Sequence, residues 1–214
     1  MYAKVIDNIV VEIMVKPDWI QASTGEAVSD TYLIQTEGIY PIIDTLPTYN
    51  ERTQTITRND LSSWTVNENS VEATYTISNK PIEDIKESMI NEVHIARYTK
   101  LYSSNIPYTF PGDSEPSGVQ MRDEVDRQNL QDLYGGALGF IIDGDPGHSM
   151  SFKTTDNIVK ALTASQVKSF GQHLKTRGDT IIAYSWVLKA QIRNATTIGE
   201  LEAIVIDPDN FIVE

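Results

Sequence analysis

The chain has 214 residues, of which 17 are lysine or arginine and 30 are aspartate or glutamate, so its formal net charge at pH 7 is −13. A surface this acidic repels the phosphates of nucleic acids and the headgroups of anionic membranes, which argues against both as partners. Because the sequence contains no cysteine, disulfides, thiolate catalysis and cysteine-ligated zinc are excluded.

The first 80 residues have the pattern of short strands joined by turns. Two β-rich runs, Tyr2–Ile6 and Ile9–Val15, flank an Asp-Asn pair and predict a hairpin. Further short strands are expected at Tyr32–Ile34 and Gly38–Ile43. Since Pro41 cannot donate a ladder hydrogen bond, the second of these should lie at a sheet edge or form extended coil.

The remainder of this segment indicates an antiparallel meander. In Val71–Ile77 the apolar residues occupy every second position and polar residues occupy the positions between them. This period of two, with one face exposed to water, is typical of antiparallel rather than parallel sheets. We therefore expect four to six strands, with further candidates at Tyr49–Thr57 and Leu61–Val66.

The pattern changes at Pro81, where helical spacing begins. Apolar residues then recur at three and four residues through Tyr102, and proline is tolerated in the first turn of a helix. A loop at 105–117, with a short strand possible at Tyr108–Phe110, separates this helix from a second one predicted over Val119–Ile142.

The last third of the chain predicts a hairpin followed by the longest helix. The hairpin pairs Ser149–Thr154 with Ile158–Leu162. Capping-box spacing at Thr163–Gln166 opens a helix of roughly 30 residues, and a second box at Thr197–Glu200 opens a short one. The apolar tail residues, expected to pack back onto the fold, are Phe211, Ile212 and Val213.

The predicted fold class is therefore α+β. We expect an N-terminal antiparallel β module at 1–80, followed by a helical domain at 81–214 with a small β-hairpin insertion. No apolar run approaches the length of a bilayer span. Asp7 and Glu12 interrupt the apolar start of the chain, so we expect no cleaved signal peptide.

Candidate chemistry is sparse, and we expect no enzyme activity and no cofactor. None of the three histidines has a metal-binding or catalytic spacing, and no phosphate-binding loop is present. Asp143, Asp145 and His148 share one turn and could hold a metal ion through oxygen and nitrogen ligands. The alternating Asp, fixed Gly and closing Glu of a calcium loop are missing, so a helix-to-strand turn is favoured.

A structural network is expected on the second helix. Asp126, Arg127 and Asn129 lie within one turn of each other, and a buried arginine needs a hydrogen-bonding partner. Such a network would hold this helix against the hairpin. The ten tyrosines and three tryptophans also favour contact surfaces, because each combines an apolar body with a polar tip.

Two sets of segments resemble small bacteriophage tail proteins. The first set is similar to their N-terminal module and comprises Glu37–Ile42, Pro47–Asn50, Trp64, Val71–Ile77 and Lys80–Pro81. The second resembles a domain of unknown function found in tail-fibre and tail-assembly-associated proteins. It comprises Asp126–Leu130, Ser151–Asn157, Leu162–Val167, Leu188–Ile192, Ala195–Thr197 and Leu201–Ile204.

The resemblance covers about residues 37–204, and its motifs are helix caps and core positions. Phe152 stands where the family favours tryptophan before the turn, a difference that concerns packing and not chemistry. The family has no agreed catalytic residue, so none is transferred to this chain.

What the resemblance implies is a structural component of a phage tail, at the tail tip, baseplate or fibre attachment, that acts by protein–protein docking. The expected partners are other tail proteins and further copies of the chain, through self-association or in a symmetric ring. The expected location is the virion tail, after synthesis in the host cytoplasm. Two alternatives stay open: a tail-fibre assembly factor absent from the virion, and a host-polysaccharide hydrolase or sugar-binding module.

Overall fold

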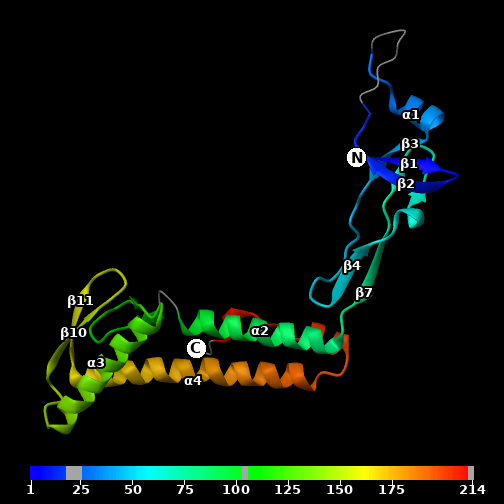
Figure 1. Cartoon of the computed structure of the whole chain (residues 1–214). Helices are drawn as coiled ribbons and strands as arrows, with labels where there is room; N and C mark the ends of the chain where they lie inside the picture. The colour runs from blue at the N-terminus through cyan, green and yellow to red at the C-terminus, as the bar shows by residue number, and fades with distance from the viewer. Residues whose placement is uncertain (18–25, 103–105, 212–214) are drawn as a thin grey trace. The chain divides into compact units, whose positions relative to one another are not determined.

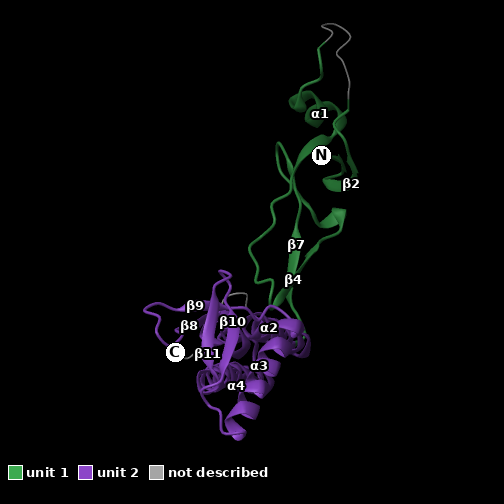
Figure 2. Cartoon of the chain, turned by 90° about the vertical axis from the view of Figure 1, so that its left-hand side faces the viewer, with its two compact units in different colours: residues 1–81 green, residues 82–214 purple. Residues whose placement is uncertain are grey.

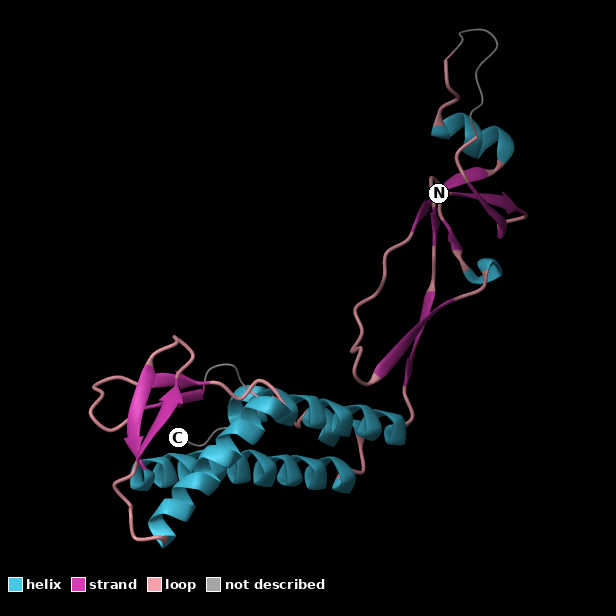
Figure 3. Ribbon diagram, turned by 60° about the vertical axis from the view of Figure 1, so that its left-hand side comes forward, coloured by secondary structure: helices cyan, strands magenta, loops and turns pink. Residues whose placement is uncertain are grey.

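The computed structural model describes residues 1–17, 26–102 and 106–211 (Figure 1). The chain forms two compact units, Met1–Pro81 and Ile82–Glu214, called here the N-terminal unit and the C-terminal unit (Figure 2). The first is built mainly of strands and the second mainly of helices with small antiparallel strand pairs (Figure 3). The predicted α+β class is confirmed.

A five-stranded sheet organises the N-terminal unit. The predicted hairpin is confirmed as an antiparallel pair at one end of the sheet, whose strand order is β2-β1-β3-β6-β5. Ala3, Val10, Trp64 and Val71 are buried in its core. The strands are β1 (Tyr2–Ile6), β2 (Ile9–Met14), β3 (Ile39–Ile43), β5 (Thr65–Val66) and β6 (Val71–Glu72).

The prediction for the strand around Pro41 is wrong, because β3 lies in the centre of the sheet. Pro41 is opposite Tyr2 of β1, between two hydrogen-bonded positions: Ile42 donates to the Met1 carbonyl at 3.1 Å, and Val5 donates to the Gly38 carbonyl at 2.8 Å. The pairing of β3 with β1 therefore needs no N–H group from residue 41. The pairing of β3 with its other neighbour, β6, begins only at Ile42 and needs none either.

The expected purely antiparallel meander is also corrected. The pairing of β3 with β6 is parallel. The run Val71–Ile77 is not one strand, because it divides into β6 and β7 (Tyr75–Asn79). β7 leaves the five-stranded sheet and pairs antiparallel with β4 (Gln54–Arg58) in a separate two-stranded ribbon. Between β4 and β5 the chain makes the short 3-10 turn η1 (Leu61–Ser63).

The segment Tyr32–Ile34, predicted as a strand, is helical. It belongs to α1 (Asp30–Glu37), whose first turn is capped by the Ser29 side chain. Gly38 ends the helix in the left-handed conformation, with φ at 60°, and its N–H donates back to the last turn. Leu33 is the buried residue of α1. A run of three apolar residues could not distinguish a strand from one helical turn, whereas the caps on both sides determine the outcome.

The C-terminal unit contains the helices that the apolar periodicity predicted. Both capping boxes are confirmed, and so is the hairpin predicted from Ser149–Thr154 and Ile158–Leu162, whose strands differ from the prediction by one residue at three of their four ends. The second helix begins later than expected, because Val119 ends a strand and Asp123 caps the helix. Phe211 is buried, while Ile212 and Val213 lie outside the described residues. The helical elements are α2 (Ile82–Leu101), α3 (Glu124–Ile142), α4 (Ala164–Asn194), α5 (Ile198–Glu202) and the 3-10 turn η2 (Pro208–Phe211).

The strands of this unit form two antiparallel pairs. β8 (Ile106–Tyr108) pairs with β9 (Ser117–Val119), and β10 (Ser149–Lys153) pairs with β11 (Val159–Thr163). The β10–β11 hairpin lies at the N-terminal end of α4, and α3 crosses the same half of that helix (Figure 3). The hairpin turn uses Asn157 at a positive φ of 66°.

Helix α4 contributes to two separate hydrophobic cores. Its N-terminal half packs Val167 and Phe170 against α3 and the strand pairs. Its C-terminal half packs Ile181 and Leu188 against α2 and the segment that contains α5 and η2. Helices α2 and α4 run side by side along this second core (Figure 1). The whole unit is thus assembled around one 31-residue helix.

Replacing Thr163 with alanine should lower the free energy of unfolding by about 1 kcal/mol. The Thr163 hydroxyl accepts from the Gln166 N–H at 3.2 Å, and the Gln166 side chain accepts from the Thr163 N–H at 2.8 Å. Urea unfolding followed by far-UV circular dichroism measures the loss. The exposed mid-helix variant Thr176→Ala serves as the control, and an equal loss in both variants would contradict a specific capping effect.

Candidate functional site

The turn that carries the candidate metal ligands is held together by its own contacts. Asp143 caps the C-terminus of α3, and the Nδ1 atom of His148 lies 3.1 Å from the Oδ2 atom of Asp145. The His148 ring stacks on Phe140 with a centroid distance of 3.6 Å. Within 1–17, 26–102 and 106–211, no three histidine, aspartate or glutamate side chains come together as a metal-binding group.

The expected network of Asp126, Arg127 and Asn129 does not form as one unit. Asp126 accepts from the backbone and guanidinium of Arg122, at 2.8–3.1 Å, and these hydrogen bonds lower the pKa of its carboxyl. Arg127 pairs with Glu124, and Asn129 is exposed beside the β10 strand. The first two pairs stabilise the start of α3, so they do not hold this helix against the hairpin.

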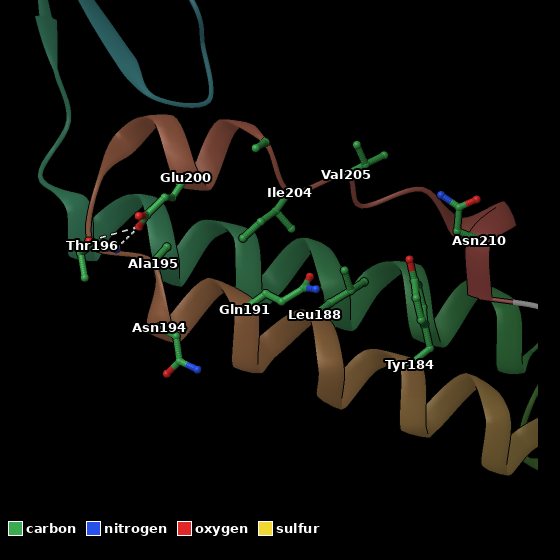
Figure 4. A pocket seen from close by; sticks show the side chains of 11 residues that line it. Tyr184, Leu188, Gln191, Asn194, Ala195, Thr196, Glu200, Ile204, Val205 and Asn210 are labelled. Atoms are coloured by element: carbon green, nitrogen blue, oxygen red, sulfur yellow. Dashed lines mark hydrogen bonds between the residues drawn. The ribbon is translucent and has the colours of Figure 1, made fainter.

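An open groove of about 620 Å³ lies between α4 and the segment that follows it (Figure 4). Apolar and neutral polar side chains form most of its lining. Glu200, which also lines it, accepts from the backbone N–H groups of Thr196 and Thr197, and these hydrogen bonds lower the pKa of its carboxyl. Because this carboxylate caps α5, the groove offers shape and hydrogen-bonding groups and does not present an acid–base pair.

A second groove, of about 360 Å³, lies between α3 and α4 and is mainly apolar. Leu130 and Tyr134 line it from α3, and Leu174 lines it from α4. Gly171 allows the two helices to approach here, because a Cβ atom at this position would collide with the Tyr134 ring. We therefore interpret this groove as a feature of the packing between α3 and α4.

A cluster of basic side chains joins α2 to α4. It consists of His94 and Arg97 on α2 with Lys189 and Arg193 on α4, and is called here the His94 cluster. The Lys189 amine lies 3.2 Å from the Nε2 atom of His94, and an Arg97 guanidinium nitrogen lies 3.3 Å from Nδ1 of the same ring. Both ring nitrogens of His94 therefore face a cationic group.

The electrostatics of the His94 cluster disfavour positive charge at its centre. Lys189 is only 7% exposed. Burial and the nearby Arg97 and Arg193 lower the pKa of its amine. Burial also lowers the pKa of His94, and Lys189, Arg97 and Arg193 add to that effect. In the described part of the chain, no carboxylate forms an ion pair with any of the four side chains, although Glu83 and Glu87 line a pocket together with Arg193.

Exposed aromatic side chains flank the His94 cluster along both helices. Trp186, which is 64% exposed, lies one turn before Lys189 on α4, and Tyr98, which is 60% exposed, lies one turn after His94 on α2. Each residue of a helix is rotated by about 100° from the one before it, so positions two apart in the sequence differ by about 200°. Trp186 therefore points away from Tyr184, which lines the groove of Figure 4. The cluster and these side chains form a surface distinct from that groove.

Sequence reasoning missed the His94 cluster. His94 and Lys189 are 95 residues apart, and each stands alone among residues that read as ordinary helix faces. Only the antiparallel packing of α2 on α4 brings them together. One signal was available in the sequence. The apolar residues of this helix repeat through Ile181, Leu188 and Ile192, and Trp186 does not fall on the face that they share.

Comparisons with known proteins identify one family. A family model described as "Domain of unknown function (DUF4376)" matches residues 84–207, more than half of the chain and most of the C-terminal unit. No curated protein and no solved structure matches the chain. Among the described residues, no helix combines the length and the apolar character needed to cross a bilayer.

Proposed function

The chain belongs to the DUF4376 family, and we propose that it is a structural component of a bacteriophage tail that acts by binding other tail proteins. The resemblance of residues 37–204 to small tail proteins supports the tail role. The surface around the His94 cluster supports binding to proteins as the mode of action.

The observation that carries this proposal is the exposure of Trp186 on a well-packed helix. Exposed tryptophan and tyrosine side chains dominate the binding energy of many protein interfaces, because they bury a large apolar area at a small entropic cost. Tyr98 and Ile95, both about 60% exposed, extend the apolar surface on α2. A surface of this kind on a packed helix pair fits a docking role better than a role in the core of its own unit.

The test compares phage particles that carry the wild-type chain with particles that carry Trp186→Ala. We expect mass spectrometry of purified virions to find the wild-type chain at a fixed copy number, and the variant reduced at least fivefold. The folded protein should be unaffected, because substitutions at exposed positions change stability by about 0.5 kcal/mol or less. The control is Val125→Ala, which removes an exposed apolar side chain from α3.

Three outcomes would contradict the proposal. A chain found only in infected cells, bound to unassembled fibres, would establish the assembly-factor alternative. Release of reducing ends from host polysaccharide by the pure protein would establish the hydrolase. Normal incorporation of Trp186→Ala would exclude this surface as the docking site.

A further inference from the structure

The His94 cluster contains more cationic donors than it can satisfy. A neutral imidazole has one N–H and one acceptor nitrogen, and a protonated imidazole has no acceptor at all. Lys189 and Arg97 both approach this ring, at 3.2 and 3.3 Å, so at most one of them donates to His94 when both are charged. The other cation then faces an N–H group.

One protonation state resolves this conflict without a ligand. If Lys189 is neutral, its nitrogen accepts from the Nε2–H group of His94, while Nδ1 accepts from Arg97. Burial and the neighbouring Arg97 and Arg193 lower the pKa of Lys189, which is the direction this arrangement requires. An anion placed beside the amine would reverse the preference, because it would accept from a protonated Lys189 and from Arg97 or Arg193 together.

The position of this cluster on an acidic chain is informative. The net charge is −13, yet these four basic side chains gather on one surface, and none of the ion pairs among the described residues includes any of them. Isolated cations on an acidic surface are usually neutralised by neighbouring acids. Glu83 and Glu87 lie on the Arg193 side of the cluster, whereas His94 and Lys189 have no carboxylate partner among the described residues. Trp186 and Tyr98, both exposed, lie within about one helical turn of Lys189 and His94.

We propose that the His94 cluster binds an acidic segment of a partner protein, with a carboxylate beside Lys189, Arg97 and Arg193 and an apolar side chain of the same segment against Trp186. The proposal deepens the docking role proposed above and rests on it for the identity of the partner as a protein. Charge complementarity selects the acidic segment, and the flanking aromatic surface selects a peptide over a small inorganic anion.

The test uses the full-length protein and two fluorescent peptides with blocked ends, one of alternating glutamate and leucine and one of alternating glutamine and leucine. Fluorescence anisotropy should show at least tenfold tighter binding of the glutamate peptide, and this preference should shrink as salt is raised. Equal affinity for the two peptides would overturn the proposal.

The variants Lys189→Met and Arg193→Gln should each lose at least fivefold in affinity for the glutamate peptide. Methionine fills the volume of the buried lysine stem, and Arg193 is exposed, so Arg193→Gln tests the site even if Lys189→Met does not fold. The control is Lys175→Gln, which removes an exposed cation of α4 that pairs with Asp179. Wild-type affinity in both variants would overturn the proposal.

The pH dependence gives an independent readout. The charged and titratable groups of the cluster are His94 and Arg97 from α2 and Lys189 and Arg193 from α4, and Glu83, Lys86 and Glu87 of α2 lie beside Arg193. The carboxylates of the peptide and of the two glutamates stay ionised above pH 6. Because the bound carboxylate favours protonated Lys189, wild-type affinity should fall as the pH rises from 6 to 10. Arg193→Gln should retain this fall and Lys189→Met should reduce it; an identical profile in both would contradict the role of Lys189.

Two further outcomes separate this inference from the proposed function. Inorganic phosphate that displaces the glutamate peptide completely at low millimolar concentration would replace the peptide site with a small-anion site and overturn the inference. Binding of the glutamate peptide by a chain that is absent from virions would overturn the tail role and leave the acidic-segment site standing.

Discussion

Replacing Phe170 with alanine should lower the free energy of unfolding of the C-terminal unit by about 3–5 kcal/mol. Phe170 is fully buried on α4. The centroid of its ring lies 4.8–5.3 Å from the ring centroids of Tyr108, Phe110 and Phe152. Truncation removes apolar area from the core and leaves a cavity that rigid neighbouring rings cannot fill. Because α2–α5 belong to this unit, urea unfolding followed by far-UV circular dichroism reports its stability.

The matched control for this prediction is Phe170→Leu, which retains most of the volume and should cost clearly less than the alanine variant. A second control, Val187→Ala, truncates an exposed apolar residue of the same helix and should change stability by about 0.5 kcal/mol or less. Equal losses for alanine and leucine at position 170 would show that ring contacts, rather than the cavity, determine the effect.

Replacing Gly38 with alanine should destabilise the N-terminal unit by about 2–4 kcal/mol. Gly38 has φ at +60°, where an L-residue with a side chain costs about 1–2 kcal/mol. In addition, a Cβ atom would lie 2.7 Å from the Val5 carbonyl oxygen, a backbone atom of β1 that cannot move without disturbing the sheet. The turn that joins α1 to the central strand β3 would therefore have to shift.

The control for this variant is Gly112→Ala, since Gly112 also has a positive φ, of 95°, but a Cβ atom there would meet nothing within 4 Å. Because Gly112 lies in the C-terminal unit, each loss is measured on its own unit, and a larger loss at Gly38 reports the collision with β1. Hydrogen exchange resolved by peptide should show faster exchange in β1 and β3 for Gly38→Ala. Equal losses at the two glycines would mean that the left-handed conformation alone sets the cost.

Elements marked by a long apolar repeat, a capping box or a turn pair between two strands could be predicted from the sequence, whereas the short helix α1 could not. The 31 residues of α4 repeat their apolar period many times, and Thr163 and Gln166 mark its start. The eight residues of α1 offer a single buried leucine, so the pattern Tyr32–Ile34 was compatible with a strand. Local propensity is a weak guide at that length, and Ser29 and Gly38 contain the information that decides it.

The central position of β3 and the His94 cluster could not be predicted for a different reason. A proline cannot donate a backbone hydrogen bond to a neighbouring strand, but this does not determine whether its strand has one neighbour or two. Pro41 fits a central strand because the pairing with β6 begins only at Ile42, after the proline. The cluster depends on the register between α2 and α4. A helix repeats its face every few residues, so sequence alone leaves open which turn of α2 meets Lys189.

The continuity of α4 has a mechanical consequence. Its 31 residues span about 46 Å and connect the two hydrophobic cores without a linker. A pull or twist applied to one core would be transmitted along the axis to the other as a rigid-body displacement. Gly178 is the residue of lowest helical propensity between the two cores, so bending of this helix is expected to concentrate there.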